Sequence, residues 1–554
     1  MHPGESGYIG NLKIKNRIVM APMISNLGNP DGSTNENHIS YLEARAKGGF
    51  GLIITEYTFV NNRNSRGSVN ETGVYDRKFI PKFRRLTERV HMHGARTFMQ
   101  LVHAGGKASQ QYNRMRSFAP SSVDYIGTTP WELTQEDISD IIEDFVHAAR
   151  NAKDSFFDGI ELHGAHGYLI SEFMSPTLNR RTDRYGGDLE RRLRFPQEVV
   201  DAIRSEMDFP VGMRISLYEN GDNAYHPEYG LKIAENIKNL DYVHFSAGIF
   251  NPPGSSASFY DSRTHIFNQL PRRPAVTTMV VGSVMDLEDA ERVLSGADFV
   301  AVARPSLADP YFAMKLLESN VPLRPCIRCN QACRDLALGE VRCTVNPETG
   351  LENYNQKHYV QKLNGHIAVS GGGIKGMEAA LEAAKHGLKV TLYHNGERLG
   401  GQLLSIADKR KAIEFSKLIE YYEKALEMAE VEVKLNSENG SGIICTPDKV
   451  YPDLPEKDEI WVDSNIYKHH DQALEWSENH KVYMSSRSLS SLDRSRALEY
   501  KKLASEKGIV FVDHAGKDFD ISIIERNQYD IRSAIVSGRE LIRKYIERNS
   551  LDYL

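Results

Sequence analysis

Several features that would place the chain in a common class are scarce or absent. Its 554 residues include only five cysteines and three tryptophans, and Lys plus Arg (68) do not outnumber Asp plus Glu (74). The formal net charge of −6 gives no reason to expect a nucleic-acid partner. No apolar run approaches the length that crosses a bilayer, and the start, MHPGESGYIGNLKIKNRIVMAPM, lacks the features of a signal peptide. We therefore expect a cytoplasmic protein that binds neither membranes nor nucleic acids.

Four of the five cysteines lie within one short segment. Cys326, Cys329, Cys333 and Cys343 form C-x2-C-x3-C-x9-C. In a reducing cytosol, clustered thiols bind metals rather than pair as disulfides. The spacing alone leaves a zinc ion and an iron–sulfur cluster open, because structural zinc sites often use two C-x2-C pairs and this segment has one. Cys445 stands apart and is predicted to be a small buried side chain.

Before the cysteines, short β-branched runs alternate with helix-compatible stretches. Eight such alternations over roughly 300 residues favour an α/β fold with a (β/α)8 TIM barrel. Two stacked α/β halves are the alternative. The predicted strands are residues 18–21, 51–55, 96–102, 159–163, 211–215, 242–246, 275–281 and 299–303.

The carboxyl ends of these strands carry the candidate catalytic residues, since TIM-barrel sites form there. His163, His166 and Tyr168 follow the fourth strand. Two imidazoles can donate hydrogen bonds to a developing oxyanion, and a phenol can pass a proton. A structural role for the histidines and a zinc pair are the alternatives. Small residues at the last two strand ends, Gly282–Ser283 and Ala303–Arg304, leave N–H groups open to a phosphate.

After the cysteines comes a glycine-rich loop between a strand and a helix. A predicted strand at 366–370 runs into G-x-G-x-x-G at Gly371, Gly373 and Gly376, followed by a helix at 377–386 and a strand at 389–393. The glycines permit a pyrophosphate to approach the helix N-terminus. Residues 459–525 repeat a β-α-β rhythm without this fingerprint. The pattern predicts a Rossmann-like region whose second half is degenerate.

The segment ELHGAHGYLISEFMSPTLNRRTDRYGGDLERRLRF (161–195) resembles the signature of the old yellow enzyme family of NADH:flavin oxidoreductases. With CIRCNQAC (326–333) and the dinucleotide loop, the chain is similar to that family's iron–sulfur branch, which includes 2,4-dienoyl-CoA reductase, 2-enoate reductase and trimethylamine dehydrogenase. The resemblance implies an FMN-binding TIM barrel over 1–319 and a [4Fe–4S] segment and linker over 320–364. It further implies a Rossmann-like FAD- or ADP-binding half over 365–458, a shortened, degenerate second nucleotide-binding half over 459–525, and a C-terminal helix over 526–554 that returns to the first half.

The resemblance also implies where FMN lies. The end of the first strand and part of the second would contact its ring, and two later strand ends would hold its phosphate. Gln100 would bond the pyrimidine edge of the ring, and Arg214 would favour the reduced, anionic flavin. The residues expected at FMN are Ala21, Pro22, Met23, Tyr57, Gln100, Arg214, Gly282, Ser283, Ala303 and Arg304.

The reaction implied is reduction of an activated C=C bond in an enone, enoate or enoyl thioester. His163 and His166 would hold the carbonyl oxygen, FMN would deliver hydride, and Tyr168 would protonate the α-carbon. The four clustered cysteines would hold a [4Fe–4S] cluster that passes single electrons to FMN. Electrons would come from NAD(P)H or a separate donor. Relatives often assemble, so the resemblance allows a homo-oligomer.

An FAD or ADP-like nucleotide would lie at Gly371, Gly373, Gly376, Gly401 and Gln402. His394 stands where a ribose-binding acid is expected, which leaves an empty site as the alternative.

Two other functions remain open. Thr55-Glu56-Tyr57 resembles trimethylamine dehydrogenase and suggests an amine dehydrogenase or demethylase acting oxidatively, although the three tryptophans do not fall where its aromatic bowl would need them. The second alternative function is that of an electron-transfer subunit with a separate reductase partner.

Overall fold

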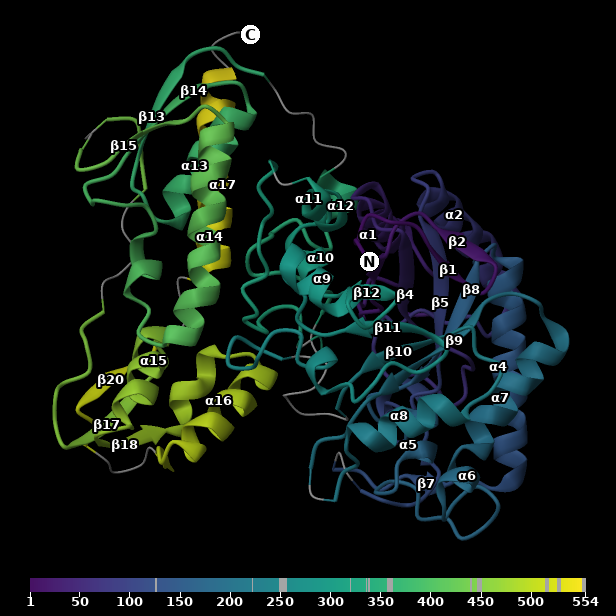
Figure 1. Cartoon of the computed structure of the whole chain (residues 1–554). Coiled ribbons are helices and arrows are strands. Elements are labelled where there is room, and N and C mark those ends of the chain that lie inside the picture. Colours follow the sequence, from purple (N-terminus) through teal and green to yellow (C-terminus); the bar gives the residue numbers. More distant parts are fainter. Residues whose placement is uncertain are drawn as a thin grey trace. The chain divides into compact units, whose positions relative to one another are not determined.

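The computed structural model describes residues 1–124, 127–221, 223–248, 257–318, 320–334, 336, 339–355, 362–438, 441–445, 451–513, 518–525 and 530–550. The chain forms two compact units (Figure 1). The barrel unit comprises Met1–Val321, Leu336–Val341 and Thr349–Asn353. The C-terminal unit comprises Pro322–Asp335, Arg342–Glu348 and Tyr354–Leu554.

Eight parallel strands close into a barrel, so the TIM-barrel prediction is confirmed. Each predicted strand corresponds to one of them, and nearly all of their residues are buried, as expected for parallel strands enclosed on both faces. In barrel order they are β3 (Ile18–Met20), β4 (Leu52–Phe59), β5 (Arg96–Val102), β8 (Gly159–Gly164), β9 (Val211–Ser216), β10 (Tyr242–Ser246), β11 (Thr277–Val281) and β12 (Phe299–Val302).

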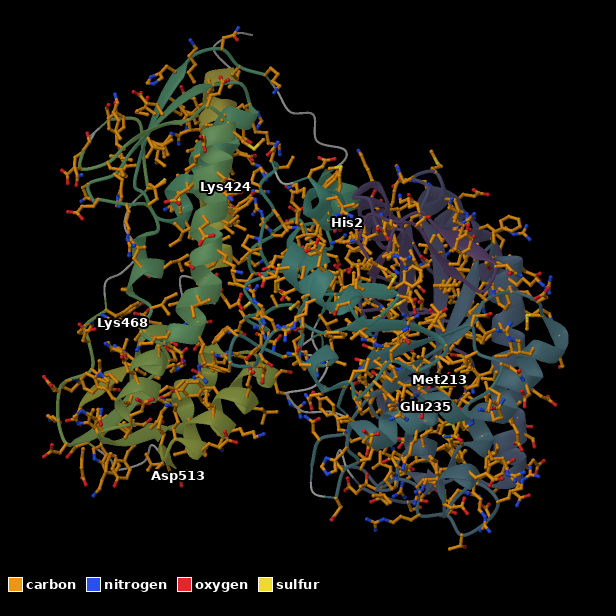
Figure 2. All side chains as sticks on the ribbon, viewed as in Figure 1. His2, Met213, Glu235, Lys424, Lys468 and Asp513 are labelled. Carbon is orange, nitrogen blue, oxygen red and sulfur yellow. The ribbon has the colours of Figure 1, made fainter. Side chains whose placement is uncertain are left out.

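Amphipathic helices follow the strands and cover the barrel, with α1 packed on α2 and α4 on α7 (Figure 1). Met213, on the barrel strand β9, is fully buried, whereas Glu235, on the covering helix α8, pairs with Arg272 near the surface (Figure 2). The longer helices are α1 (Glu36–Lys47), α2 (Ile80–His91), α4 (Gln135–Asp154), α7 (Arg194–Glu206), α8 (Pro227–Asn236) and α9 (Leu287–Leu294). The shorter ones are α3 (Gln110–Asn113), α5 (Leu169–Met174), α6 (Leu189–Arg192), α10 (Pro305–Ala308), α11 (Phe312–Leu317) and α12 (Glu352–Asn355).

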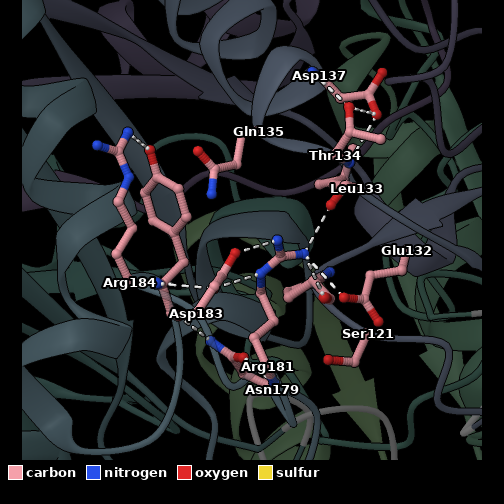
Figure 3. Close-up of polar contacts among 12 residues, drawn as sticks. Ser121, Glu132, Leu133, Thr134, Gln135, Asp137, Asn179, Arg181, Asp183 and Arg184 are labelled. Atoms are coloured by element: carbon pink, nitrogen blue, oxygen red, sulfur yellow. Dashed lines mark hydrogen bonds and ion pairs between the residues drawn. The ribbon is translucent and has the colours of Figure 1, made fainter.

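Two small sheets lie outside the barrel: the hairpin β1 (Gly7–Ile9) with β2 (Leu12–Ile14), and β6 (Phe118–Ala119) with β7 (Trp131–Glu132). A buried arginine of the signature segment holds the second (Figure 3). Arg181 donates to the carbonyls of Pro120 at 3.0 Å and Leu133 at 2.7 Å. Its other nitrogens bind Asp183 at 3.0 and 2.6 Å. This part of the signature therefore fastens the long loops that follow β5.

The C-terminal unit contains two four-stranded parallel sheets, which confirms the predicted Rossmann-like α/β region. The first has the order β15 (Glu432–Lys434), β14 (Lys389–Tyr393), β13 (His366–Ser370) and β16 (Ile443–Ile444). The second has the order β19 (Val510–Val512), β18 (Lys481–Ser485), β17 (Glu459–Ser464) and β20 (Ile521–Ile523). The helices are α13 (Ile374–Lys385), α14 (Lys409–Met428), α15 (Tyr467–Trp476), α16 (Arg494–Glu506) and α17 (Ile531–Ser550).

The last helix, α17, packs along α13 of the first sheet (Figure 1). Residues 526–529 and 551–554 of the predicted C-terminal segment lie outside the described residues. Over the part of the chain that is described, no helix combines the length and apolar character needed to span a bilayer.

Candidate functional site

A buried carboxylate organises the inside of the barrel. Glu161 on β8 is fully buried, and its Oε1 accepts a hydrogen bond from Gln100 Nε2 at 2.7 Å. Its Oε2 accepts from the Tyr242 hydroxyl at 3.0 Å and lies 2.9 Å from His244 Nδ1. Gln100 is also fully buried, and its Oε1 has no partner among the described residues. The carboxylate thus fixes the amide orientation and leaves its acceptor open.

Arg214 joins two strand ends. Its Nη1 donates to the Pro22 carbonyl at 3.1 Å, and its Nη2 lies 3.2 Å from Ser246 Oγ. Its Nε is buried without a partner among the described residues. Burial lowers the pKa of Arg214 to about 10, so the guanidinium is still charged at neutral pH. Ala21 and Pro22 are buried beside it, and Met23 is half-buried.

The seventh strand ends in a tight turn. Gly282 has φ +138° and a Cβ there would meet the Ile266 side chain at 3.0 Å, so the position suits glycine. Ser283 follows with φ +55°, and its buried hydroxyl has no partner among the described residues. Ala303 and Arg304 come directly before α10, and Arg304 Nη2 donates to the Ala257 carbonyl at 2.5 Å.

Unpaired polar atoms therefore mark several strand ends. A buried polar atom without a partner costs about 1–3 kcal/mol, so an acceptor on Gln100, a donor on Arg214 and a hydroxyl on Ser283 indicate a missing polar ligand. In FMN, the polar edge of the ring would pair with Gln100 and Arg214, and the phosphate would pair with Ser283. The residues present fit this group.

The loop after β8 gathers the predicted catalytic side chains. The ring centroids of His163 and Tyr168 are 4.7 Å apart, those of His163 and His166 5.1 Å, and those of Tyr57 and Tyr168 5.3 Å. His163 Nδ1 accepts the N–H of Ala165 at 3.3 Å, so the neutral ring carries its proton on Nε2. Burial, then the charges of Arg214 and Lys107, lower the pKa of His163. It is therefore a neutral N–H donor at physiological pH.

His166 is held by residues that the sequence patterns did not identify. Its Nε2 lies 2.7 Å from Ser246 Oγ on β10, and its backbone N–H donates to Ser216 Oγ at 3.0 Å. Lys107 donates to the His166 carbonyl, and its Nζ is 5.2 Å from the centroid of the Tyr168 ring. Sequence reasoning also missed Glu161, although a charged residue inside the otherwise apolar run at 159–162 was a usable signal.

The cysteine segment lies in the C-terminal unit. Burial and the nearby thiols of Cys326 and Cys329 raise the pKa of Cys343 to about 12. Between these cysteines, every second residue is left-handed: Arg328, Asn330 and Ala332 have φ of 53°, 54° and 59°. Alternating backbone of this kind turns N–H groups into a concavity, as at many iron–sulfur sites.

Among the described residues, no three or more metal-ligating side chains are grouped to hold a single metal ion. A structural zinc site and a [4Fe–4S] cluster are both held by four thiolates, so the number of cysteines in this segment suits either group. The turn and thiols of this segment fit a cluster.

Three elements of the C-terminal unit anchor the cysteine segment. Arg328 donates to Glu414 of α14 at 3.1 Å, and both residues are buried. Arg324 lies 3.7 Å from Glu378 of α13. The N–H of Ala332 donates to Asp493, which caps α16, at 2.5 Å. A buried ion pair is costly to break once formed, so these contacts fix where the thiols lie.

The predicted nucleotide loop has the expected backbone. A Cβ at Gly376 would meet the Gly371 carbonyl at 1.7 Å, so only glycine permits this approach of helix and strand. Gly373 caps α13, and a Cβ at Gly401 would lie 3.0 Å from its Cα, so the two glycine segments are adjacent. Gln402 beside them is exposed. His394 turns back onto this loop, its Nδ1 accepting the Gly372 N–H at 3.3 Å.

At the corresponding point of the second sheet, after β17 and β20, described residues bridge the two strand ends. Asn465 donates to the Glu525 carbonyl and accepts the Glu525 N–H, both at 2.9 Å. Ser464 Oγ lies 2.7 Å from His469 Nδ1. Nucleotides bind parallel sheets where the strand order reverses, and here protein side chains span that point.

Comparison with known proteins agrees with this geometry. Residues 8–323 match the NADH:flavin oxidoreductase / NADH oxidase family, and residues 369–425 match the NAD(P)-binding Rossmann-like domain. The chain is 40% identical over 446 residues to an NADH oxidase of Thermoanaerobacter brockii, covering 77% of this chain and 68% of that protein. It is 34% identical over 466 residues to a cinnamate reductase of Clostridium sporogenes, covering 77% and 70%.

A solved structure of 2-naphthoyl-CoA reductase in complex with 2-naphthoyl-CoA has the same fold. Its TM-score is 0.88 at 21% identity, covering 98% of this chain and 99% of that one. The family match covers more than half of the chain, and the NADH oxidase relative is similar over most of its length. The chain is therefore a flavin-dependent oxidoreductase and belongs to the NADH:flavin oxidoreductase / NADH oxidase family.

Proposed function

We propose that the protein reduces an activated C=C bond, using FMN in the barrel and a [4Fe–4S] cluster on Cys326, Cys329, Cys333 and Cys343. The substrate class is an enone, enoate or enoyl thioester. The observation that carries this proposal is the pairing of a neutral imidazole N–H donor with a phenol 4.7 Å away, measured between the ring centroids of His163 and Tyr168. The cinnamate reductase relative supports the same substrate class.

FMN, when bound, supplies the hydride that adds to the β-carbon. His163 donates its Nε2–H to the substrate carbonyl oxygen, where negative charge builds as the hydride adds. Because burial keeps His163 neutral, it polarises the oxygen without surrendering its proton. His166, whose position is fixed by its contact with Ser246, binds the same substrate carbonyl oxygen. Tyr168 then gives its hydroxyl proton to the α-carbon.

The cluster would supply single electrons. The cysteine segment that would hold it is anchored by Glu414, Glu378 and Asp493. The glycine loops at Gly371–Gly376 and Gly401 are proposed to bind an adenine nucleotide, with FAD or NAD(P)H as the candidates. At the second sheet, Asn465 bridges the ends of β17 and β20, so we place the nucleotide at the first sheet. Electrons reach the protein from NAD(P)H or from a separate donor.

The test is anaerobic purification followed by counting of FMN, FAD, iron and sulfide, and then reoxidation of the photoreduced protein. We expect cinnamate, crotonyl-CoA or cyclohex-2-enone to reoxidise the flavin. Products made in D2O should carry one deuterium on the α-carbon, from the tyrosine, and one on the β-carbon, because photoreduced flavin takes its transferable hydrogen from solvent. 3-Phenylpropanoate, which lacks the double bond, is the matched control and should do nothing. Bleaching of the oxidised protein by sarcosine, with no response to any alkene, would favour the oxidative amine alternative.

Replacing Glu161 with glutamine should reverse the orientation of the Gln100 amide. In Glu161→Gln, the new side chain must still accept from Tyr242 and His244, so it presents its NH2 group to Gln100. Gln100 then has to turn its amide so that its Oε1 faces position 161. Its NH2 group, a donor, then occupies the position where Oε1 is now an open acceptor. We expect the FMN dissociation constant to rise roughly 5- to 150-fold, equivalent to about 1–3 kcal/mol, in a titration of apoprotein.

The control exchanges the two side chains. Gln100→Glu combined with Glu161→Gln places a carboxylate at 100 and an amide at 161, which restores an acceptor at the open position. It should recover FMN binding relative to the single variant. Equal affinity in wild type and Glu161→Gln would show that the amide does not contact the ring.

A further inference from the structure

The loop between the third and fourth cysteines of the cysteine segment is fastened to the barrel. Its residues Leu336–Val341 belong to the barrel unit, whereas Cys333 and Cys343 on either side of them belong to the C-terminal unit. The loop forms hydrogen bonds with Ser25 and Asn26, which follow β3 at the carboxyl end of the barrel. TIM-barrel sites are built at this end of the strands, so the loop is held where the chemistry is expected.

Asn26 uses its whole amide to hold the loop. Its Nδ2 donates to the carbonyls of Leu336 and Gly339, both at 3.1 Å, and its Oδ1 accepts from the Ser68 hydroxyl at 2.7 Å. The side chain is fully buried, and its φ of +54° lies in the left-handed region that asparagine tolerates better than most residues. Because the donors and the acceptor of the amide are all engaged, Asn26 fixes two points of the loop.

The neighbouring residue fixes a third point. The Ser25 carbonyl accepts the N–H of Val341 at 2.8 Å, and the Ser25 N–H donates to Glu56 Oε2. Glu56 is 2% exposed and lies on β4, where the register against β5 shifts between Ile54 and Tyr57. A register irregularity of this kind redirects side chains, and here a carboxylate holds the peptide that receives the loop.

A second buried carboxyl fixes the hydroxyl partner of the amide. Glu71 Oε2 accepts the N–H groups of Gly67 at 2.7 Å and Ser68 at 2.9 Å. Arg66 donates to the Ser68 carbonyl at 2.9 Å. Ser68 is therefore held on both sides of its backbone. We refer to the whole set as the loop clamp, which comprises Ser25, Asn26, Glu56, Ser68 and Glu71.

The loop clamp is separated from the cysteine segment and from the expected FMN residues by short pieces of chain. Cys343 follows Val341 by two residues, so their α-carbons are at most about 7 Å apart. On the barrel side, Ser25 follows Met23, the last of the three residues expected at the FMN ring, by the same number. Neither piece is long enough to move far while the clamp is closed.

We propose that Asn26, together with the rest of the loop clamp, is a positioning residue for electron transfer from the [4Fe–4S] cluster to FMN. The inference rests on the proposed function, in which Cys333 and Cys343 help to hold that cluster. In each transfer one electron leaves the reduced cluster and enters the flavin, and two transfers with one proton from solvent give the reduced, anionic flavin. A low-potential one-electron donor resupplies the cluster. Because electron transfer slows steeply with distance, release of the loop should slow it.

The test replaces the amide with a carboxylate of the same shape. Asn26→Asp loses both donors, retains the acceptor for Ser68, and repels the carbonyls of Leu336 and Gly339. In the anaerobic holoenzyme, hydrogen exchange at the Val341 N–H, followed by mass spectrometry, should accelerate about 10- to 100-fold because two buried hydrogen bonds are lost. Flavin reduction by reduced methyl viologen, followed by stopped-flow absorbance, should slow about tenfold because the repelled loop is displaced.

Three further measurements separate electron delivery from damage to the barrel. Iron, sulfide and FMN should stay at wild-type content in Asn26→Asp, and cinnamate should reoxidise its photoreduced flavin at the wild-type rate. Cys326→Ala combined with Cys329→Ala gives the rate of any direct reduction of FMN by the viologen, which is subtracted. Asn26→Gly also suits a positive φ and adds no charge, so it should slow flavin reduction in the same way.

Asn179→Asp is the matched control for the loss of a buried amide. Asn179 is 1% exposed, and its Nδ2 donates to the carbonyls of Phe173 at 2.7 Å and Tyr185 at 2.8 Å, within the signature segment (Figure 3). The control should lower the melting temperature about as much as Asn26→Asp. It should leave exchange at Val341 and flavin reduction by the viologen at wild-type values. Equal slowing in both variants would indicate general destabilisation and would overturn the proposal.

The remaining outcomes distinguish this inference from the proposed function. Full iron content with a wild-type rate of flavin reduction in both Asn26 variants would overturn the inference alone. Loss of iron from these variants would show that the loop clamp retains the ligands rather than setting the transfer, and would overturn it as well. Wild-type protein without iron and sulfide would instead remove the cluster from the proposed function, whatever the Asn26 variants do.

Discussion

Replacing Tyr168 with phenylalanine is expected to slow reoxidation of the reduced protein by an enoate about 10²- to 10⁴-fold, the usual contribution of a positioned general acid. The phenyl ring keeps the packing against His163 and Tyr57, since those contacts are between rings, with centroids 4.7 and 5.3 Å apart. Only the hydroxyl group, and with it the transferable proton, is lost. FMN content and the melting temperature should therefore stay close to wild type.

The decisive control uses an oxidant that accepts no proton on carbon. Ferricyanide takes electrons singly, so Tyr168→Phe should reoxidise with ferricyanide at the wild-type rate while failing with cinnamate. Stopped-flow absorbance of the flavin measures both. Equal slowing with both oxidants would mean that Tyr168 affects the flavin itself, and an unchanged cinnamate rate would remove its role as proton donor.

The barrel could be predicted from the sequence because its signal is local. Each strand is a short β-branched run that pairs with the next strand in the barrel, so the alternation of such runs with helix-compatible stretches located the eight barrel strands. The positions of His163, His166 and Tyr168 followed from the rule that barrel chemistry lies at strand ends. The nucleotide loop was predictable for the same reason, since its glycines act on adjacent backbone.

The supporting contacts were not predictable because their partners are remote in sequence. Glu161 meets Tyr242 and His244 across 81 and 83 residues, and His166 meets Ser246 across 80. The register shift that accompanies Glu56 has no compositional marker. His394 was identified as an unsuitable ribose ligand, but its return onto Gly372 depends on how the loop closes. The identity of a side chain gives the chemistry of which it is capable. Its ionisation state and tautomer depend on the neighbours that pack around it in the fold.

Removing two clustered thiols is expected to abolish the cluster altogether. In Cys326→Ala combined with Cys329→Ala, iron and sulfide should fall from roughly four of each per chain to near zero, as measured on anaerobically purified protein. Two ligands are lost at once, and the two thiols that remain, those of Cys333 and Cys343, are too few for a cluster that takes four thiolates. A zinc site would instead lose roughly one zinc per chain, with no sulfide in the wild type.

Cys445→Ala is the matched control, because Cys445 is also buried and free but lies after β16, outside the run. It should keep full iron and sulfide. FMN should remain in all these variants, since its proposed residues belong to the barrel unit and the cysteines to the C-terminal unit. The double variant should therefore lose turnover driven by one-electron donors while its photoreduced flavin is still reoxidised by cinnamate. Full turnover without iron would separate the cysteines from electron delivery and leave the barrel chemistry intact.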